Sequence, residues 1–259
     1  MKSILGPRGL QGILGETFKI YGKNFLRLLV IVAIVLVPML PAIETEVVKY
    51  TTFIVVIGMK LLFTVLVAFL YGALIHAVSE QYLRQTIDIG RAYRFAWGRL
   101  WAMAGAFIFI FLLIHLGGYL VGTLSIKSRF LAAICFLPVI YFKTCWALAL
   151  QAALLEGLGP IDALSRSSAL VRGNWWRVLG ILLVLFLIVL IIRNASFYLR
   201  GGAPVIATII VVILAFPIAT IGMTLLYYDL RVRKEGYNLD SLATELHIKM
   251  DGNSHEKNL

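Results

Sequence analysis

The sequence is poor in charge, since only 14% of its 259 residues are Asp, Glu, Lys or Arg, whereas 61% are hydrophobic. Soluble globular domains usually have about 25% charged residues, so this composition excludes an ordinary soluble domain. Acids are the scarcer charge, with 13 Asp and Glu against 24 Lys and Arg, and the net charge is +11. In a membrane protein such an excess is typical of basic cytoplasmic loops, so we do not expect nucleic-acid binding.

Residues that carry chemistry are also scarce, with two cysteines and four histidines in the whole chain. Cys135 and Cys145 are about 15 Å apart if their apolar run is helical, which is too far for a disulfide. No His or Cys stands at metal-ligand spacing from another. Neither a nucleophile–base–acid set nor a glycine-rich phosphate loop is present. We therefore expect no metal site, no cofactor and no enzymatic activity.

Long apolar runs dominate the remaining sequence. Six of them approach or exceed the about 20 residues that cross a bilayer, which leaves little chain for a separate soluble domain. The expected fold class is all-α, a polytopic membrane protein with one membrane domain over 1–234 and a polar cytoplasmic tail over 235–259, with a weak helix at 239–250. The predicted crossings are 25–42, 52–78, 100–124, 130–155, 175–192 and 205–228.

Three basic and aromatic stretches divide the chain, and the clearest is IDALSRSSALVRGNWWRVLG at 161–180. Setting Trp175 against Trp101 and Phe25 gives spacings of 74 and 76 residues. This regularity predicts three parallel two-helix repeats, each preceded by an amphipathic interfacial helix. The alternative is that basic and aromatic residues precede many membrane helices without any repeat. The predicted repeats are about 8–80, 86–156 and 160–229.

The basic residues are divided unequally between the two sides of the membrane. Seventeen Lys and Arg fall on one side and five on the other, and Lys60 and Lys143 lie within crossings. The positive-inside bias places both termini, and all three interfacial helices, on the cytoplasmic side. We expect the basic residues of these helices to contact anionic lipid headgroups. They are Arg91, Arg94, Arg166, Arg172 and Arg177.

An acid ends the second crossing of each predicted repeat, namely Glu80, Glu156 and Asp229, with spacings of 76 and 73 residues. The helix dipole disfavours an acid at a C-terminus, so we expect these acids to be structural and paired with a cation. The nearest cations in sequence are Arg84 for Glu80, and Arg231 and Arg233 for Asp229. For Glu156 we expect a partner from a basic segment, such as Arg91, Arg94 or Arg172.

Two lysines are predicted near the middle of their crossings, where a charge costs about 2.5–3.5 kcal/mol. One interpretation of Lys60 and Lys143 is a polar cavity that attracts anions or lipid headgroups. The other is that they extend to the interface, or are neutral and hydrogen-bonded to the backbone. His76 and His115 are interpreted as packing residues that hydrogen-bond within the membrane domain.

Three segments carry a resemblance to a known family, namely GETFKIYGKNF at 15–25, SSALVRGNWWR at 167–177 and YYDLRVRKEG at 227–236. They resemble the membrane domain attached to some bacterial glycerophosphoryl diester phosphodiesterases, and related stand-alone membrane proteins. The resemblance covers most of the chain and implies the bacterial cytoplasmic membrane. No soluble stretch of this sequence could hold the family's catalytic barrel, so phosphodiesterase activity is not expected.

Two classes of function remain. The favoured class is an accessory or scaffold protein without intrinsic catalysis, which organises lipids or a membrane partner through its crossings and basic helices. The other is a transporter or channel, with a polar cavity around Lys60 and Lys143 for an anionic or lipid-like substrate. The expected partners are the bilayer, anionic lipids in particular, and a membrane protein.

Overall fold

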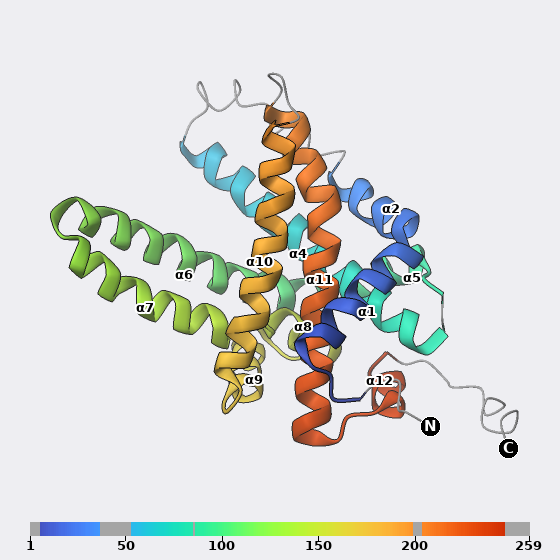
Figure 1. The fold of residues 1–259 in the computed structure, drawn as a ribbon. Helices are drawn as coiled ribbons and strands as arrows, with labels where there is room; N and C mark the ends of the chain where they lie inside the picture. Colours follow the sequence, from blue (N-terminus) through green and yellow to red (C-terminus); the bar gives the residue numbers. More distant parts are fainter. Residues whose placement is uncertain (1–5, 37–52, 85, 199–203, 247–259) are drawn as a thin grey trace, which may run out of the picture.

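The computed structural model describes residues 6–36, 53–84, 86–198 and 204–246, and within these residues all regular structure is helical (Figure 1). The all-α prediction is therefore confirmed for the described part of the chain. The first helices are α1 (Leu10–Lys23), α2 (Phe25–Leu36), α4 (Phe53–Arg84), α5 (Ile89–Gly98) and α6 (Leu100–Lys127). They are followed by α7 (Arg129–Cys145), α8 (Ala149–Leu155), α9 (Pro160–Val171), α10 (Trp175–Tyr198), α11 (Pro204–Glu235) and α12 (Leu239–Glu245).

Short helices occupy the three places where the sequence predicts them, and local signals explain where they begin. The α5 helix starts after Asp88, whose side chain accepts a hydrogen bond from the Arg91 N–H and so caps the helix. This hydrogen bond also lowers the pKa of Asp88. The α9 helix has Pro160 in its first turn, where a missing N–H costs nothing. Ala92 and Ala96 of α5 are buried, whereas Arg91 and Arg94 are exposed.

Among the described residues, five helices are long and apolar enough to cross a membrane, which supports a multi-pass membrane protein. Two of these spans, Leu100–Leu124 and Trp175–Ile192, have the predicted boundaries. The other three spans are Leu61–Arg84, Ala133–Leu155 and Ile213–Glu235. The predicted first crossing at 25–42 contains α2, which is apolar but shorter, and its remainder lies outside the described residues.

Two of the long helices end later than the sequence analysis places the ends of their crossings. The α4 helix continues past 78 to Arg84, and α11 continues past 228 to Glu235. Arg233 lies one helical turn after Asp229 and pairs with it, so the charged residues extend α11 instead of ending it. The fourth crossing is divided, since α7 ends at Cys145 and α8 begins at Ala149. Pro138 lies within α7 and does not end it.

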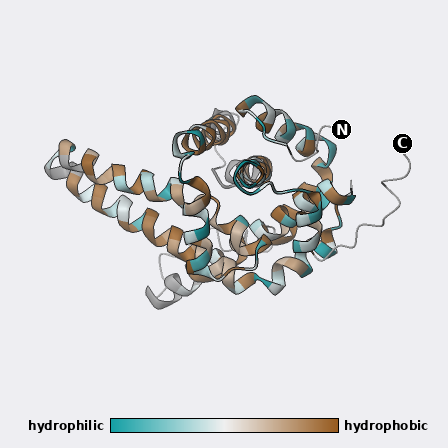
Figure 2. Ribbon diagram, turned by 90° about the horizontal axis from the view of Figure 1, so that it is seen from below, coloured by the Kyte–Doolittle hydropathy of each residue, from teal (hydrophilic) through white to brown (hydrophobic). Residues whose placement is uncertain are grey.

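Helices α4 and α11 lie at the centre of the molecule. Their apolar spans are 56% and 72% buried, whereas the spans of α6 and α10 are only 28% and 17% buried. The α6–α7 hairpin extends away from the other helices and runs in a different direction from the α10–α11 pair (Figures 1 and 2). Both pairs leave a common base that contains α8 and α9. Residues along both pairs are mostly hydrophobic, as the brown colour of the α6–α7 hairpin in Figure 2 shows, and a membrane can cover such helices.

The α12 helix corrects the boundary of the predicted polar tail. Tyr237, Leu242, Ala243 and Leu246 are at most 4% exposed, and α12 packs against α4. Apolar residues at helical spacing attach this segment to the bundle, even though it follows the charged end of α11. Residues 237–246 therefore belong to the folded domain, and the rest of the predicted tail lies outside the described residues.

A close approach between α6 and α9 gives a direct test of this packing. A Cβ at Gly105 would lie 2.5 Å from Cγ of Pro160, whereas a Cβ at Gly118, on the same helix, would meet nothing within 4 Å. Because the proline ring cannot bend away, we expect Gly105→Ala to lower stability by about 1–3 kcal/mol. Gly118→Ala should be neutral, or stabilising by up to about 1 kcal/mol.

The measurement is thermal unfolding of both purified variants in the same neutral detergent. Equal unfolding midpoints for the two variants would contradict this packing of α6 against α9.

Candidate functional site

The three acids that the sequence predicts to be structural all have arginine partners. Glu80 is buried on α4, and its Oε1 lies 2.8 Å from Nη2 of Arg91 on α5. Its Oε2 accepts a hydrogen bond of 2.9 Å from the Asp88 N–H, directly before α5. One carboxylate therefore fixes the start of α5 against the end of α4. The partner is Arg91, not the sequence neighbour Arg84.

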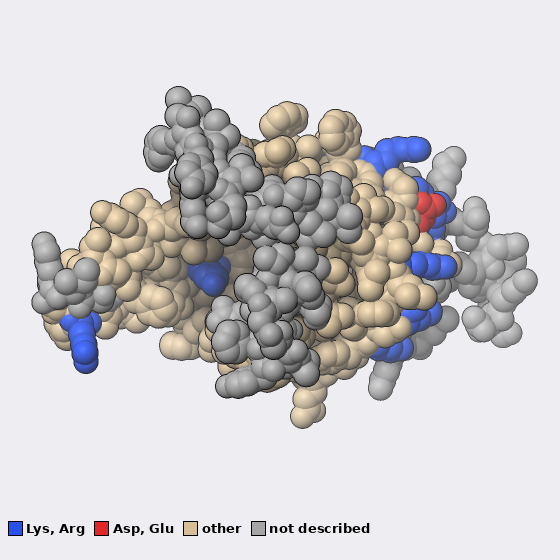
Figure 3. Space-filling view, turned by 90° about the horizontal axis from the view of Figure 1, so that it is seen from above, with Lys and Arg blue, Asp and Glu red and all other residues tan. Residues whose placement is uncertain are grey.

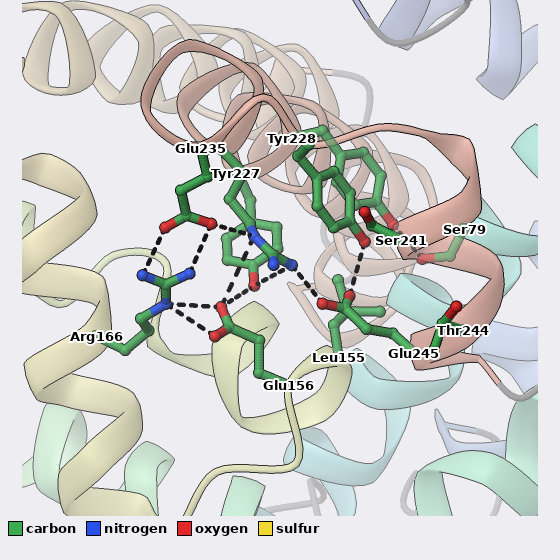
Figure 4. Close-up of polar contacts among 12 residues, drawn as sticks. Ser79, Leu155, Glu156, Arg166, Tyr227, Tyr228, Glu235, Ser241, Thr244 and Glu245 are labelled. Carbon is green, nitrogen blue, oxygen red and sulfur yellow. Dashed lines mark hydrogen bonds and ion pairs between the residues drawn. The ribbon is translucent and has the colours of Figure 1, made fainter.

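Glu156 is the C-cap residue of α8 and belongs to the largest polar network (Figure 4). Both of its oxygens accept from Nε of Arg166 on α9, at 2.9 and 2.8 Å, and Oε1 also accepts from the Tyr227 hydroxyl. Arg166 reaches Glu235 at the end of α11 as well, with Nη1 2.6 Å from Oε1. The expectation of a partner from a basic segment is met, because Arg166 lies in the third of these segments, but the named examples Arg91, Arg94 and Arg172 are not the partner. The turn between α8 and α9 brings Arg166 back over Glu156 instead.

The same network continues into α12 through Arg231. Its Nη1 donates to Glu245 at 2.7 Å and its Nε donates to Glu235 at 3.1 Å. The guanidinium also lies over the ring of Tyr237, 3.9 Å from the ring centroid. Burial lowers the pKa of Arg166, but its hydrogen bonds to Glu235 and Glu156 outweigh this effect and raise the pKa above the usual arginine value. The network therefore remains charged at physiological pH and joins α8, α9, α11 and α12.

Asp229 on α11 is the centre of a third cluster. Its side chain is 1% exposed, and Oδ2 accepts from Nη2 of Arg177 at 2.7 Å and from Nε of Arg233 at 3.0 Å. Oδ1 accepts from the backbone N–H of Arg8, just before α1, at 2.6 Å. Nη1 of Arg8 in turn donates to the Tyr82 hydroxyl of α4 at 2.9 Å. This cluster therefore joins the segment before α1, near the N-terminus, to α11, near the C-terminus, and also contacts α4 and α10.

The structure separates the five predicted interfacial arginines into two groups. Arg91, Arg166 and Arg177 are paired with the three acids, so their first role is to hold the fold together. Arg94 and Arg172 are exposed, and within the described residues neither makes an ion pair. The sequence predicts such a pairing only for Glu156, whereas in the structure all three acids pair with interfacial arginines.

The membrane lysines do not form a site in the described part of the chain. Lys143 is exposed on α7, not enclosed between helices, and Lys60 falls in α4 with its side chain outside the described residues. The two histidines pack as expected in part. The His115 ring stacks on Phe111, and the His76 ring lies 4.7 Å from that of Phe95. No group of three or more metal-ligating side chains occurs among the described residues.

Arg99 is a residue that the sequence analysis did not single out. Its Nη1 donates to the carbonyls of Leu154 and Leu155, at 2.6 and 3.2 Å, and so caps the C-terminus of α8. Gly157 follows with a φ of +69°, and a Cβ there would lie 2.6 Å from the same Nη1. The only sequence signal for this contact is the Gly157–Pro160 turn, which indicates where α8 ends but not which arginine caps it.

Comparison of the chain with protein-family models, with curated proteins and with solved structures returns no match. The resemblance to the phosphodiesterase membrane domain therefore stays a prediction from the quoted segments.

The Glu156–Arg166 pair can be tested by a double-mutant cycle. Glu156→Gln and Arg166→Gln should each lower stability by about 2 kcal/mol, between the values for exposed and fully buried pairs, because each leaves a partly dehydrated charge. The double variant should lose less than the sum of the two single losses. The readout is thermal or denaturant unfolding in detergent.

The control is the Lys19–Glu16 pair on α1, which is 3.7 Å apart and has a 74% exposed lysine, and Lys19→Gln should change stability by less than about 0.5 kcal/mol. Strictly additive losses at Glu156 and Arg166 would show that the pair contributes no coupling energy.

Proposed function

We propose that this chain is a multi-pass protein of the bacterial cytoplasmic membrane without intrinsic catalysis. It acts as an accessory or scaffold protein that organises anionic lipids, or a membrane-protein partner, around a rigid charged base. The observation that carries the proposal is the pairing of all three acids with arginines of the short helices or their neighbours. The buried charges bind one another, which favours a structural use over a reactive one.

A threefold parallel arrangement is part of this proposal. The first apolar helix of each group begins 75 residues after the one before, at Phe25, Leu100 and Trp175. Glu80 and Glu156 each pair with an arginine of the short helix that follows, and Asp229 binds the backbone just ahead of α1. Each group is thus tied to the next, and the third to the first. This pattern supports three repeats with six crossings.

The proposed orientation places the charged base and both termini in the cytoplasm. In Figure 3, which views the molecule from above, uncharged atoms cover most of the visible described surface, and Lys and Arg atoms appear mainly along one edge. The orientation is supported by the sequence, in which 17 Lys and Arg fall on one side and five on the other, because basic residues are retained on the cytoplasmic side of membranes.

Topology reporters test this orientation. Fusions at Glu46, Lys127 and Arg200 should report the outside of the cell, and fusions at Asp88 and Gly159 the cytoplasm. The reason is that each proposed repeat crosses the membrane twice, so the loops within repeats lie outside and the segments between repeats lie inside. The measurement uses a pair of reporters, one active only outside and the other only inside. A single position with inverted activity would contradict the six-crossing arrangement.

The transport alternative receives no support from the described residues. Its central residues were Lys60 and Lys143, and the second of these is exposed on the surface of α7. A long cationic side chain at such a position can extend along the helix toward the membrane interface.

Lipid binding is tested with the protein purified from its native membrane. We expect the lipids that copurify with it to be enriched in anionic species relative to the bulk membrane, because each cation near the surface contributes about 1 kcal/mol. Mass spectrometry of the extracted lipids gives this ratio. The control is a membrane protein of similar size with a neutral cytoplasmic face, purified in the same way. Copurified lipids with the bulk composition would contradict the lipid-organising role.

A further inference from the structure

A pocket of about 460 Å³ lies between the end of α4, the α5 helix and the end of α12. Its polar lining consists of Arg84, Arg91, Arg94, Arg99 and His76, and Leu246 contributes an apolar wall. The volume falls within the range of about 300–1,000 Å³ that is typical of small-ligand sites. None of the charged networks described above fills this pocket.

The charges around the pocket are unbalanced. Four guanidinium groups line it and no carboxylate does. Arg91 is neutralised by Glu80 and Asp88, and Arg99 has Glu245 in its electrostatic surroundings. Arg84 and Arg94 are exposed, and no ion pair to either occurs within the described residues, although Asp88 is in the electrostatic surroundings of Arg94. Since the guanidinium groups that line one pocket repel one another, a bound anion would stabilise the arrangement.

The chemistry of the lining indicates the kind of anion. His76 lines the pocket, but it is only 4% exposed and its Nδ1 is itself buried, so this nitrogen is not open to a ligand there. The contacts to a bound anion would therefore come from the guanidinium groups. The planar fork of arginine matches phosphate oxygens two at a time, which favours a phosphate group over a simple halide.

The surroundings of the pocket indicate where the phosphate comes from. Trp97 is 70% exposed and Trp101 is 80% exposed, and they stand on either side of Arg99 in the sequence. Exposed tryptophans are typical of the headgroup level of a membrane. The pocket therefore lies where a phosphate could enter while the lipid tails remain in the bilayer.

We propose that this pocket binds the phosphate group of an anionic lipid headgroup, with Arg84 and Arg94 supplying the uncompensated charge. This inference rests on the proposed lipid-organising function and adds a defined site to it. Free phosphate esters share the same chemistry, and the experiment below distinguishes the two sources.

The test uses the full chain in neutral detergent, with short-chain phosphatidate as the lipid probe. A ligand that binds only the folded state raises the unfolding midpoint, so a titration gives an apparent affinity. We expect phosphatidate to raise the midpoint and short-chain phosphatidylcholine to leave it unchanged. The Arg84→Gln/Arg94→Gln variant should bind phosphatidate about tenfold more weakly, or worse, because charge-assisted hydrogen bonds are lost. Both side chains are exposed, so the variant should fold.

The matched control is Lys23→Gln/Arg27→Gln, which removes two exposed cations from the α1–α2 region, away from the pocket. It should keep the parent affinity for phosphatidate. Equal weakening in the two double variants, or no weakening in either, would overturn the proposal. If Arg84→Gln/Arg94→Gln does not fold, the single variant Arg94→Gln replaces it, and an unchanged affinity in that variant would also overturn the proposal.

Glycerol 3-phosphate separates a lipid from a soluble ligand. We expect it to produce a much smaller shift than phosphatidate, because it has no acyl chains to place beside Trp97 and Trp101. An equal shift would overturn the lipid assignment. Failure of this site can be distinguished from failure of the proposed function. If anionic lipids copurify equally with the parent protein and with Arg84→Gln/Arg94→Gln, the scaffold function is retained and this pocket is not its lipid site.

Discussion

The structure depends on one constraint, which is that a carboxylate buried at the edge of a membrane must have a cation beside it. Glu80 and Asp229 are almost completely buried, so each would be strongly unfavourable if it were alone. Each is placed near the C-terminal end of a long helix, where the helix dipole adds to the cost. Arg91 and Arg177 offset this cost only when each guanidinium lies beside its carboxylate. The acids therefore fix the position of the neighbouring helices.

This constraint explains how the outer helices can expose so much apolar surface without losing their arrangement. The spans of α6 and α10 are mostly unburied, and contacts along them alone would define their directions poorly. The polar networks at the base hold α4, α5, α8, α9, α11 and α12 together instead (Figures 1 and 4). Lipid can then cover the exposed faces, which in water would be a large aggregation-prone surface.

Much of the fold could be predicted from the sequence, because its helix boundaries carry local signals. Trp175–Ile192 begins at a pair of tryptophans and ends before an arginine, and its predicted bounds are confirmed. Local signals predict a helix end too early where a charged residue follows an apolar run. Asp229 suggested an end to α11, but Arg233 one turn later pairs with it and continues the helix to Glu235.

The contacts of the site were less predictable, because they depend on how separate segments meet in space. Arg166 is only ten residues after Glu156, but the intervening turn had to be known before its guanidinium could be placed over the carboxylate. Arg99 caps α8 from a helix junction more than fifty residues away, and no pattern in the sequence relates the two. The existence of acid–arginine pairing was predictable from electrostatics. The choice of arginine was predictable for Asp229, where Arg233 stands one turn later, but not for Glu80, which pairs with Arg91 instead of Arg84.

The shortage of acids also determines which arginines are available for other roles. Thirteen acids face 24 Lys and Arg, and several of the acids are used more than once, as Asp229 is by Arg177 and Arg233. Arg84 and Arg94 are exposed and lie beside a pocket, so ordinary water or an external anion must balance them. Water would suffice for an isolated surface arginine. Four guanidinium groups around one pocket, with no carboxylate in its lining, are a different case, because a phosphate can accept from several of them at once and offset their mutual repulsion.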